Sequence, residues 1–327
     1  MTVEILSARI ATDVERAAEI LLSGGLIAVP TETVYGLGAD ASNGAAVRRV
    51  FDVKGRPTNH PLILHVADRE AAKNASTDWS PAADILAGLF WPGPLSILTE
   101  KAGAVDDVVT GGRGTVVVRV PDHPATLEVL RILHSRGSIG LAAPSANKFG
   151  AVSPTSARHV VDDLGNSIDA VLDGDDCRVG VESTIVDCRT DVPVILREGG
   201  VPFEAITDAL ARHGMTITKS PDLVGINDSA GALAPGMLES HYAPRARVEI
   251  FADVGELERR ESEVEASGMS VARLPHPDNL VEYSRNLYRW LRACDAQGVD
   301  VILAVLPPAT ELGAAIRDRL SKAAATR

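Results

Sequence analysis

Short apolar runs alternate with amphipathic segments along most of the chain, and this alternation limits the folds that the chain can form. Runs with the length and the branched aliphatic content of β-strands occupy residues 26–30, 61–66, 95–100, 115–120, 139–143, 169–173, 183–188 and 192–197. Some of these runs are separated by helical patterns and others only by turns. Strands that partly alternate with helices and partly cluster indicate an α/β fold with a mixed sheet.

Several predicted helices carry capping signals at their ends. Thr12 and Glu15 match the T-x-x-E capping box, which predicts a helix beginning there. Asn43 is predicted to begin a second helix and Gly55 to end it, because glycine readily adopts the left-handed conformation that follows a helix. Ser153 is predicted to cap a later helix.

The length of 327 residues exceeds the usual size of a single hydrophobic core, so more than one domain is expected. We predict a large domain over residues 1–205, a helix and linker over 206–244, and a small domain over 245–327. In the last of these, strand and helix patterns alternate three times. That alternation predicts a small Rossmann-like, three-layer α/β domain with a parallel sheet.

Composition excludes several classes of protein. The formal net charge is −12 and aromatic residues make up 4% of the chain, whereas RNA-binding surfaces need cations and stacking rings. Three cysteines without a C-x-x-C pair argue against a disulfide framework and a structural zinc site. The first twenty residues lack a signal-peptide core, and no apolar run reaches the roughly 18 residues of a membrane helix. We therefore expect a cytoplasmic protein without a membrane partner.

The stretch "VKGRPTNHPLILH", residues 53–65, gathers two cations and two histidines. Lys54 and Arg56 lie at the carboxyl end of the predicted helix, where the helix dipole is negative and repels an anion. An anion bound here must be held by side chains, which Arg does through its planar fork and Lys as a point charge. The alternative is that Lys54 merely contacts the last helix carbonyls. His60 and His65 do not have a usual metal-ligand spacing, so no metal site is predicted.

Other polar residues recur where predicted strands end. Ligands of open α/β sheets commonly bind in loops at strand ends. Arg119 interrupts a valine-rich strand that should be buried on both faces, and a buried arginine needs an anionic partner. Residues of this kind are Thr33, His65, Arg119, Ser145, Asn147, Ser183 and Arg197.

Six segments resemble, in sequence and in order, the motifs of the YrdC-like family. They are "PTETVYGLGAD", "KGRP…HPLILHV", "PGPLSILTE", "TVVVRVPDHP", "APSANKFGAVSPT" and "ESTIVD", and the resemblance covers roughly residues 10–205. The remaining chain, with "PGMLESHYAP" and "LGAAIRDRLSKAA", resembles the C-terminal part of the long, two-domain threonylcarbamoyl-AMP synthases. The resemblance implies a YrdC-like twisted mixed sheet with helices, followed by a small three-layer domain.

The resemblance also implies a nucleotidyltransferase reaction. L-threonine, bicarbonate and ATP would give threonylcarbamoyl-adenylate and pyrophosphate, and a downstream tRNA threonylcarbamoyl transferase system would modify adenosine 37 of tRNA. Contact with tRNA would then be only indirect. The protein would contribute positioning and charge neutralisation rather than a nucleophile. Mg²⁺ would accompany the ATP phosphates, bound mostly by phosphate oxygens and water.

The family pattern assigns roles to matching positions of this chain. The catalytic pair would be Lys54 and Arg56. His60 stands where the family usually has asparagine, and its charge could titrate near neutrality. The implied ATP contacts are Lys54, Arg56, His60, Thr115, Ser145, Asn147, Ser153 and Arg197. The implied threonine contacts are Thr33, His65, Arg119, Ala143 and Ser183, with Arg119 toward the carboxylate.

Two alternative functions share the same fold. An RNA-binding module is disfavoured by the acidity and the scarcity of aromatic rings. A carbamoyl-transfer accessory module would have the "KGRP" and "PSAN" motifs as well, but also zinc-finger cysteines, which this chain lacks. The linker around Pro235 to Tyr242 is a candidate lid over the pocket, and docking or dimerisation are equally open roles for the segment beyond it.

Overall fold

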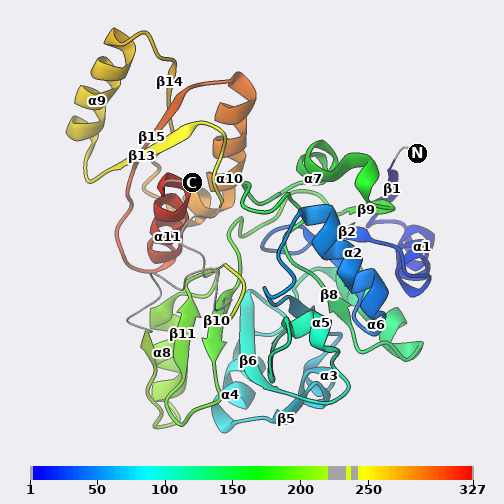
Figure 1. Cartoon of the computed structure of the whole chain (residues 1–327). Helices are drawn as coiled ribbons and strands as arrows, with labels where there is room; N and C mark the ends of the chain where they lie inside the picture. Colours follow the sequence, from blue (N-terminus) through cyan, green and yellow to red (C-terminus); the bar gives the residue numbers. More distant parts are fainter. Residues whose placement is uncertain (1–2, 220–232, 237–241, 326–327) are drawn as a thin grey trace.

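The computed structural model describes residues 3–219, 233–236 and 242–325, and it contains two separate sheets (Figure 1). We call residues 3–219 the large unit and residues 245–325 the C-terminal unit. The strands of the large unit are β1 (Glu4–Ser7), β2 (Ile27–Val29), β3 (Gly36–Asp40), β4 (Ile63–His65), β5 (Ser76–Asp78), β6 (Leu95–Lys101), β7 (Thr115–Arg119), β8 (Leu141–Ala142), β9 (Ala170–Asp173), β10 (Thr184–Asp187), β11 (Val194–Arg197) and β12 (Thr218–Lys219). Its helices are α1 (Ala11–Leu22), α2 (Gly44–Lys54), α3 (Arg69–Asn74), α4 (Pro81–Phe90), α5 (Asp107–Thr110), α6 (Pro124–Ser135), α7 (Ala157–Leu164), the 3₁₀ turn Gly165–Ser167 and α8 (Phe203–Ala211).

The strands of the large unit form one mixed sheet in the order β1-β9-β2-β3-β8-β4-β7-β6-β10-β11-β12, with β5 paired to β6. Parallel pairs such as β4 with β7 and β6 with β10 alternate with antiparallel pairs such as β6 with β7. This arrangement confirms the mixed α/β sheet expected from the sequence.

Alternation along the central strands separates a helix-covered face from the face that bears the pocket. Leu64 and Val118 belong to a core cluster that includes Phe51 on α2 and Leu86 on α4. Ile63 and Val117 point to the other face, where they pack with Leu233 and Ala234. Since side chains alternate along a strand, His65 and Arg119 share the face of Ile63 and Val117.

The C-terminal unit has a three-stranded parallel sheet in the order β13-β15-β14, as predicted. Successive residues of β15 face opposite layers: Leu303 packs with Leu257 on α9, and Ile302 with Leu287 on α10. Figure 1 shows α9 on the outer side and α10 and α11 on the side of the large unit. Its elements are β13 (Arg247–Phe251), α9 (Val254–Ala266), β14 (Val271–Arg273), α10 (Leu280–Gln297), β15 (Val301–Val305) and α11 (Leu312–Ala324).

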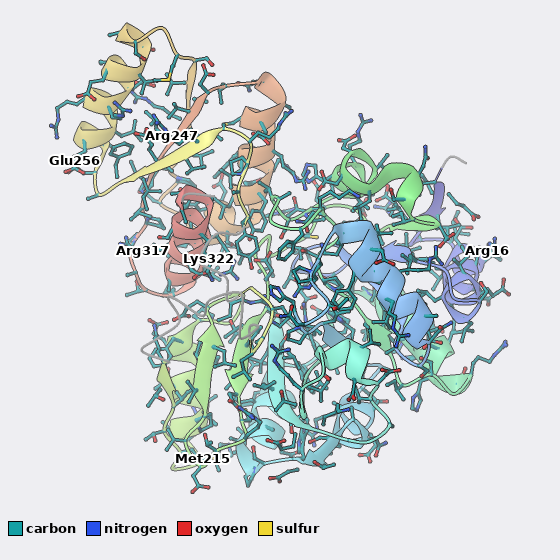
Figure 2. All side chains as sticks on the ribbon, in the orientation of Figure 1. Arg16, Met215, Arg247, Glu256, Arg317 and Lys322 are labelled. Carbon is teal, nitrogen blue, oxygen red and sulfur yellow. The ribbon has the colours of Figure 1, made fainter. Side chains whose placement is uncertain are left out.

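Charged side chains join the two units. Arg292 on α10 forms an ion pair of 2.5 Å with Asp163 on α7, and Arg289 pairs with Asp176. Lys322 on α11, which lies on the side facing the large unit in Figure 2, donates to the carbonyl of Gly236 at 2.7 Å. Within the described residues, no helix has the length and apolar character needed to cross a membrane.

Two of the predicted helix starts are wrong, although Asn43 and Gly55 do cap α2. Helix α1 begins at Ala11 after Ile10, so Thr12 lies inside the helix and no capping box forms. Helix α7 is capped by Ser156, whose hydroxyl accepts from the backbone of His159. The Ser153 hydroxyl is bonded to a buried carboxylate instead.

Short elements were missed from the sequence. The predicted polar loop "TETVYGLGAD" contains β3, and β1, α3, β5, α5 and β12 were not predicted. All of these have six residues or fewer, too few for a hydrophobic period to show. Much of the predicted linker and lid, residues 220–232 and 237–241, lies outside the described residues.

We expect Gly199→Ala to destabilise the large unit because the β10–β11 hairpin approaches Gly199 closely. A Cβ there would lie 2.4 Å from the Glu182 carbonyl oxygen and equally close to the backbone of Ser183 and Thr184. Overpacking of this kind lowers the free energy of unfolding by about 1–3 kcal/mol. The matched control is Gly103→Ala, where a Cβ would meet nothing within 4 Å. Equal urea midpoints for the two variants would contradict this reading.

Candidate functional site

The pairing of β4 with β7 sets the position of two polar side chains. The strands are parallel, and His65 stands opposite Arg119 in the register. Each is the last residue of its strand, so both lie at the same edge of the sheet, on the face away from the helices. Their nearness therefore follows from strand register rather than from the loops.

His65 and Arg119 line a pocket with an empty volume of about 540 Å³, including its mouth. The pocket lies against the open face of the large sheet, and three arginines line it. It is lined by Thr31, Thr33, Val34, Gly36, Arg56, Ile63, His65, Arg119, Ala143, Pro144, Ser145, Glu182, Ser183, Arg197, Pro235, Gly236 and Tyr242.

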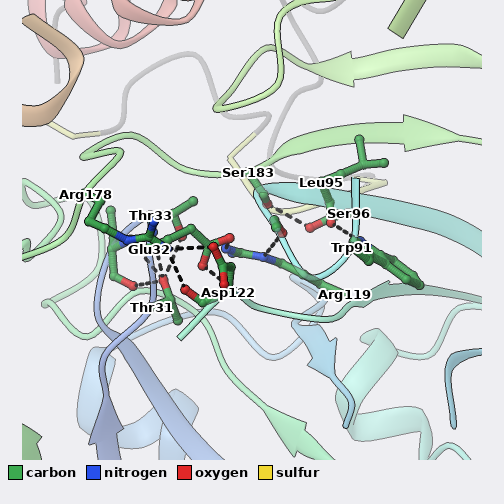
Figure 3. Close-up of polar contacts among 12 residues, drawn as sticks. Thr31, Glu32, Thr33, Trp91, Leu95, Ser96, Arg119, Asp122, Arg178 and Ser183 are labelled. Carbon is green, nitrogen blue, oxygen red and sulfur yellow. Dashed lines mark hydrogen bonds and ion pairs between the residues drawn. The ribbon is translucent and has the colours of Figure 1, made fainter. Parts of the chain in front are cut away.

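Arg119 has a protein carboxylate as its partner (Figure 3). Its Nη2 donates to Oε1 of Glu32 at 2.7 Å, and its Nε donates to the Gly93 carbonyl at 3.2 Å. The other Glu32 oxygen accepts from the backbone N–H of Asp122 at 3.0 Å. Both side chains of this ion pair are buried. The burial of Arg119 and its need for an anion are confirmed, and the anion is Glu32.

The amine of Lys54 organises a backbone loop. Lys54 is the last residue of α2 and is buried, and its Nζ donates to the carbonyls of Ser145 at 2.6 Å and Asn147 at 2.5 Å. Burial and then the neighbouring Arg56 hold the pKa of Lys54 well below its ordinary value. The last carbonyls of α2 are therefore not the partners of Lys54. The side chain ties the "PSAN" loop to the end of the helix.

Arg56 is a buried cation with spare hydrogen-bonding capacity. Its Nη2 donates to the Pro61 carbonyl at 3.0 Å, and its guanidinium lies 5.7 Å from the Phe149 ring centroid. Among the described residues its Nε has no hydrogen-bond partner. Burial lowers the pKa of Arg56 to about 10, so the group stays charged at neutral pH. A buried charged donor without a partner is suited to a ligand.

Arg197 and Ser183 form the opposite wall. The Arg197 guanidinium donates to the Ser183 carbonyl at 2.8 Å, to its hydroxyl at 3.1 Å and to the Pro235 carbonyl at 2.9 Å. The Ser183 hydroxyl also contacts the Ser96 hydroxyl at 2.7 Å. Arg197 thereby joins the end of β11 to residues 235–236, although these lie far along the chain.

The structure brings eight of the thirteen predicted contact residues to the pocket lining: Thr33, Arg56, His65, Arg119, Ala143, Ser145, Ser183 and Arg197. The other five, Lys54, His60, Thr115, Asn147 and Ser153, are not among the lining residues. Asn147 donates to the carbonyls of Lys148 and Ala151, and its Oδ1 has no partner among the described residues. His60 is buried with its ring 5.6 Å from that of Phe149, and Thr115 begins β7.

Comparison with known proteins identifies the family of this chain. A family model described as "Telomere recombination" matches residues 19–199, and one described as "Threonylcarbamoyl-AMP synthase, C-terminal domain" matches residues 201–325. The threonylcarbamoyl-AMP synthase of Pyrococcus abyssi is 39% identical, over 95% of this chain and 94% of its own length. The Bacillus subtilis threonylcarbamoyl-AMP synthase is 37% identical, over 96% and 93%. The chain belongs to the threonylcarbamoyl-AMP synthase family.

A solved structure supports the same assignment. The crystal structure of Pyrococcus abyssi Sua5 complexed with L-threonine superimposes with a TM-score of 0.90 at 37% identity, covering 99% of this chain and 98% of that one. The chain is accordingly a transferase enzyme, as expected from its motifs, and its two-sheet architecture is that of the long form.

Two acidic residues of the site were missed from the sequence: Glu182, which lines the pocket, and Glu32, which pairs with Arg119. Pro235, Gly236 and Tyr242 also line the pocket and belong to the segment named above as a candidate lid. Glu32 carried a usable signal, since an acidic residue between two threonines directly follows a buried strand. The described residues contain no group of three His, Cys, Asp or Glu side chains close enough to hold a metal ion.

We expect protein stability to fall below about pH 6.5 because of His65. Burial, followed by the charge of Arg119, lowers the pKa of the folded ring to about 3, while an unfolded histidine titrates near 6.5. A depressed histidine pKa contributes stability above pH 6.5 that is lost progressively as the pH falls toward 3. From pH 7.5 to pH 5 the wild type should lose about 2 kcal/mol more than His65→Gln, as measured by urea unfolding. Parallel curves would show that the ring is protonated when folded.

Proposed function

We propose that the chain joins L-threonine, bicarbonate and ATP into threonylcarbamoyl-adenylate with release of pyrophosphate. The observation that carries the proposal is the lining of the pocket, in which Arg56 and Arg197 lie together with His65 and Arg119. Several arginines in one pocket suit two anionic groups, a triphosphate and the carboxylate of an amino acid. The relative whose crystal structure is complexed with L-threonine is similar to this chain over nearly its full length.

The amino-acid end would lie beside β4 and β7. Among the described residues, the Nη1 of Arg119 has no hydrogen bond, and it is free to donate to threonine's carboxylate. The neutral ring of His65 places Nδ1 3.2 Å from the Ile63 carbonyl, so with the proton on Nδ1 its Nε2 is an acceptor for threonine. Thr33, Ala143 and Ser183 would complete this end.

The nucleotide end would use side chains that still lack partners. Arg56 Nε and Asn147 Oδ1 are buried and unpartnered among the described residues, and both were assigned to ATP from the motifs. Charge-assisted hydrogen bonds from a guanidinium are well matched to phosphate oxygens. His60, Thr115, Ser145, Ser153 and Arg197 are the further proposed contacts, and Lys54 would act through the loop that it holds.

Positioning of the substrates by the protein can account for the chemistry. Threonine's amine attacks bicarbonate to form a carbamate with loss of water, and a carbamate oxygen then attacks the α-phosphorus and expels pyrophosphate. The chain would orient both substrates, exclude water and stabilise charge on the phosphates. Mg²⁺ is proposed to travel with ATP, bound by phosphate oxygens and water. Glu32 and Glu182 are engaged with arginines, so neither is a free metal ligand.

The product would feed a tRNA threonylcarbamoyl transferase system that modifies adenosine 37. We assign the chemistry to residues 1–205, the linking segment to 206–244 and a supporting role to 245–327. A cytoplasmic location stays a prediction from the sequence.

The direct test is to incubate the purified full chain with ATP, bicarbonate and labelled threonine. Threonylcarbamoyl-adenylate and pyrophosphate should appear together, and omission of threonine should abolish both. Pyrophosphate release without threonine would identify a plain ATP pyrophosphohydrolase and overturn the proposal.

Arg56→Ala should lower the rate of adenylate formation roughly ten- to a hundredfold without unfolding the protein. A charged hydrogen bond is worth about 1.5–3 kcal/mol, and about 1.4 kcal/mol corresponds to a tenfold change in rate. Arg131→Ala is the matched control, because Arg131 is exposed on α6 and its ion pair within the described part of the chain is with Glu128. A folded Arg56→Ala protein with an unchanged rate would remove Arg56 from the phosphate site.

For Arg119, the double variant Arg119→Met/Glu32→Gln is the informative one. Arg119→Met alone leaves the buried Glu32 carboxylate without its cation, which costs about 3–5 kcal/mol. The double variant removes both charges and should fold, yet bind threonine at least tenfold more weakly, while ATP affinity changes much less. Calorimetric titration with threonine alone measures the effect. Unchanged threonine affinity would show that Arg119 serves only the fold.

A further inference from the structure

Glu182 places a carboxylate inside the pocket proposed for a triphosphate. It is 6% exposed and lines the pocket together with Arg56 and Arg197. An uncompensated negative charge at this position would repel phosphate oxygens strongly, because charges interact at long range in a poorly hydrated site. The structure must therefore compensate this charge or keep it away from the ligand.

Three donors converge on the Glu182 carboxylate. The Ser153 hydroxyl donates to Oε1 at 2.6 Å, the Tyr288 hydroxyl to Oε2 at 2.8 Å, and Arg319 Nε to Oε2 at 2.7 Å. Burial alone would raise the pKa of Glu182, but Arg319, Arg197 and Ser153 outweigh it and hold the pKa at about 2. Glu182 is therefore ionised at neutral pH, and the cation that hydrogen-bonds to it, Arg319, comes from the C-terminal unit.

Arg319 is a costly residue to bury. Its side chain on α11 is 0% exposed and lies 5.1 Å from the centroid of the Tyr242 ring. Its Nη1 contacts Asp318, and its Nη2 has no hydrogen-bond partner among the described residues. A buried ion pair is often no more stabilising than apolar residues of similar size. Stability alone therefore does not account for an arginine here.

The segment that carries Glu182 is packed tightly against the C-terminal unit. A Cβ on Gly180 would lie 2.4 Å from the carbonyl oxygen of Ser284 on α10, so only glycine fits this approach. The residue after Glu182 is Ser183, which contacts Arg197 and Ser96. The orientation of Glu182 is thus linked to Ser153 on one side and to Ser183 on the other.

We propose that Arg319 is a positioning residue for the ATP side of the pocket, acting through Glu182. By compensating and orienting this carboxylate, Arg319 allows phosphates to approach Arg56 and Arg197 and keeps Ser153 and Ser183 in place. The C-terminal unit thereby completes the active site electrostatically without contacting the substrate through Arg319. The inference rests on the proposed function, since ATP is the ligand concerned.

The test compares ATP affinity among variants of the full chain. Titration with Mg·ATP at pH 8 should show binding at least tenfold weaker for Arg319→Met, with a smaller change in threonine affinity. Adding Glu182→Gln to that variant should recover most of the loss, because it removes the uncompensated charge. A purely structural role for Arg319 predicts that the second substitution adds to the damage.

A pH profile separates charge compensation from packing. In Arg319→Met the carboxylate of Glu182 loses its main cation and its pKa rises, so ATP affinity should recover between pH 8 and pH 6 relative to the wild type. The charged and titratable groups facing Glu182 are Arg197 on β11, Tyr242, Tyr288 on α10 and Arg319 itself. Burial raises the pKa of Tyr242 to about 12 and holds that of Tyr288 well above its ordinary value, so neither tyrosine titrates in this range.

The control is Arg289→Met, which breaks a half-exposed ion pair between the units, with Asp176 on the large unit, and should bind ATP like the wild type. Equal ATP affinity for Arg319→Met and the control, or a double variant as weak as Arg319→Met, overturns the proposal. If Arg319→Met does not fold, the ATP affinity of the double variant Arg319→Met/Glu182→Gln is the deciding measurement. ATP affinity within tenfold of the wild type supports the proposal, and a larger loss overturns it.

A failure of the proposed function would give a different set of results from a failure of this inference alone. Wild type and Arg289→Met would then both form no threonylcarbamoyl-adenylate, whereas failure of the inference alone leaves both active. In the former case the inference falls with the function on which it rests.

Discussion

The burial of arginine side chains around one pocket is the constraint on which the rest of the structure depends. A guanidinium keeps its charge at neutral pH, so each one removed from water needs acceptors that the fold supplies. Arg119 takes them from Glu32 and Gly93, Arg197 from Ser183 and Pro235, and Arg319 from Glu182. Arg56 is only partly satisfied, which leaves it suited to a ligand.

These contacts also explain why the chain keeps two units together. Acceptors for the buried cations come from segments far apart in sequence, and Glu182 meets Arg319 across 137 positions. The pocket is therefore held by the large sheet on one side and by α10 and α11 on the other. Motion of the C-terminal unit would change the electrostatic potential of the pocket as well as its shape.

Local signals in the sequence predicted much of the fold. The caps of α2, the parallel sheet of the C-terminal unit and the burial of Arg119 follow from short-range patterns. The partner of Arg119 could not be predicted from such patterns, because Glu32 lies 87 positions away and only the register of distant strands brings it close. Ser153 was misassigned for a similar reason: a serine before a proline is a plausible cap, and no local pattern reveals the carboxylate of Glu182 that it contacts.

The hydrogen bonds of Lys54 have a consequence for how this chain can change in evolution. Lys54 contacts main-chain carbonyls of residues 145 and 147, and every amino acid provides such a carbonyl. Side chains in this loop can therefore diverge without breaking the contact. The length of the loop cannot diverge so freely, since one inserted or deleted residue would shift both carbonyls away from the amine. Insertions and deletions should be far rarer than substitutions between β8 and α7.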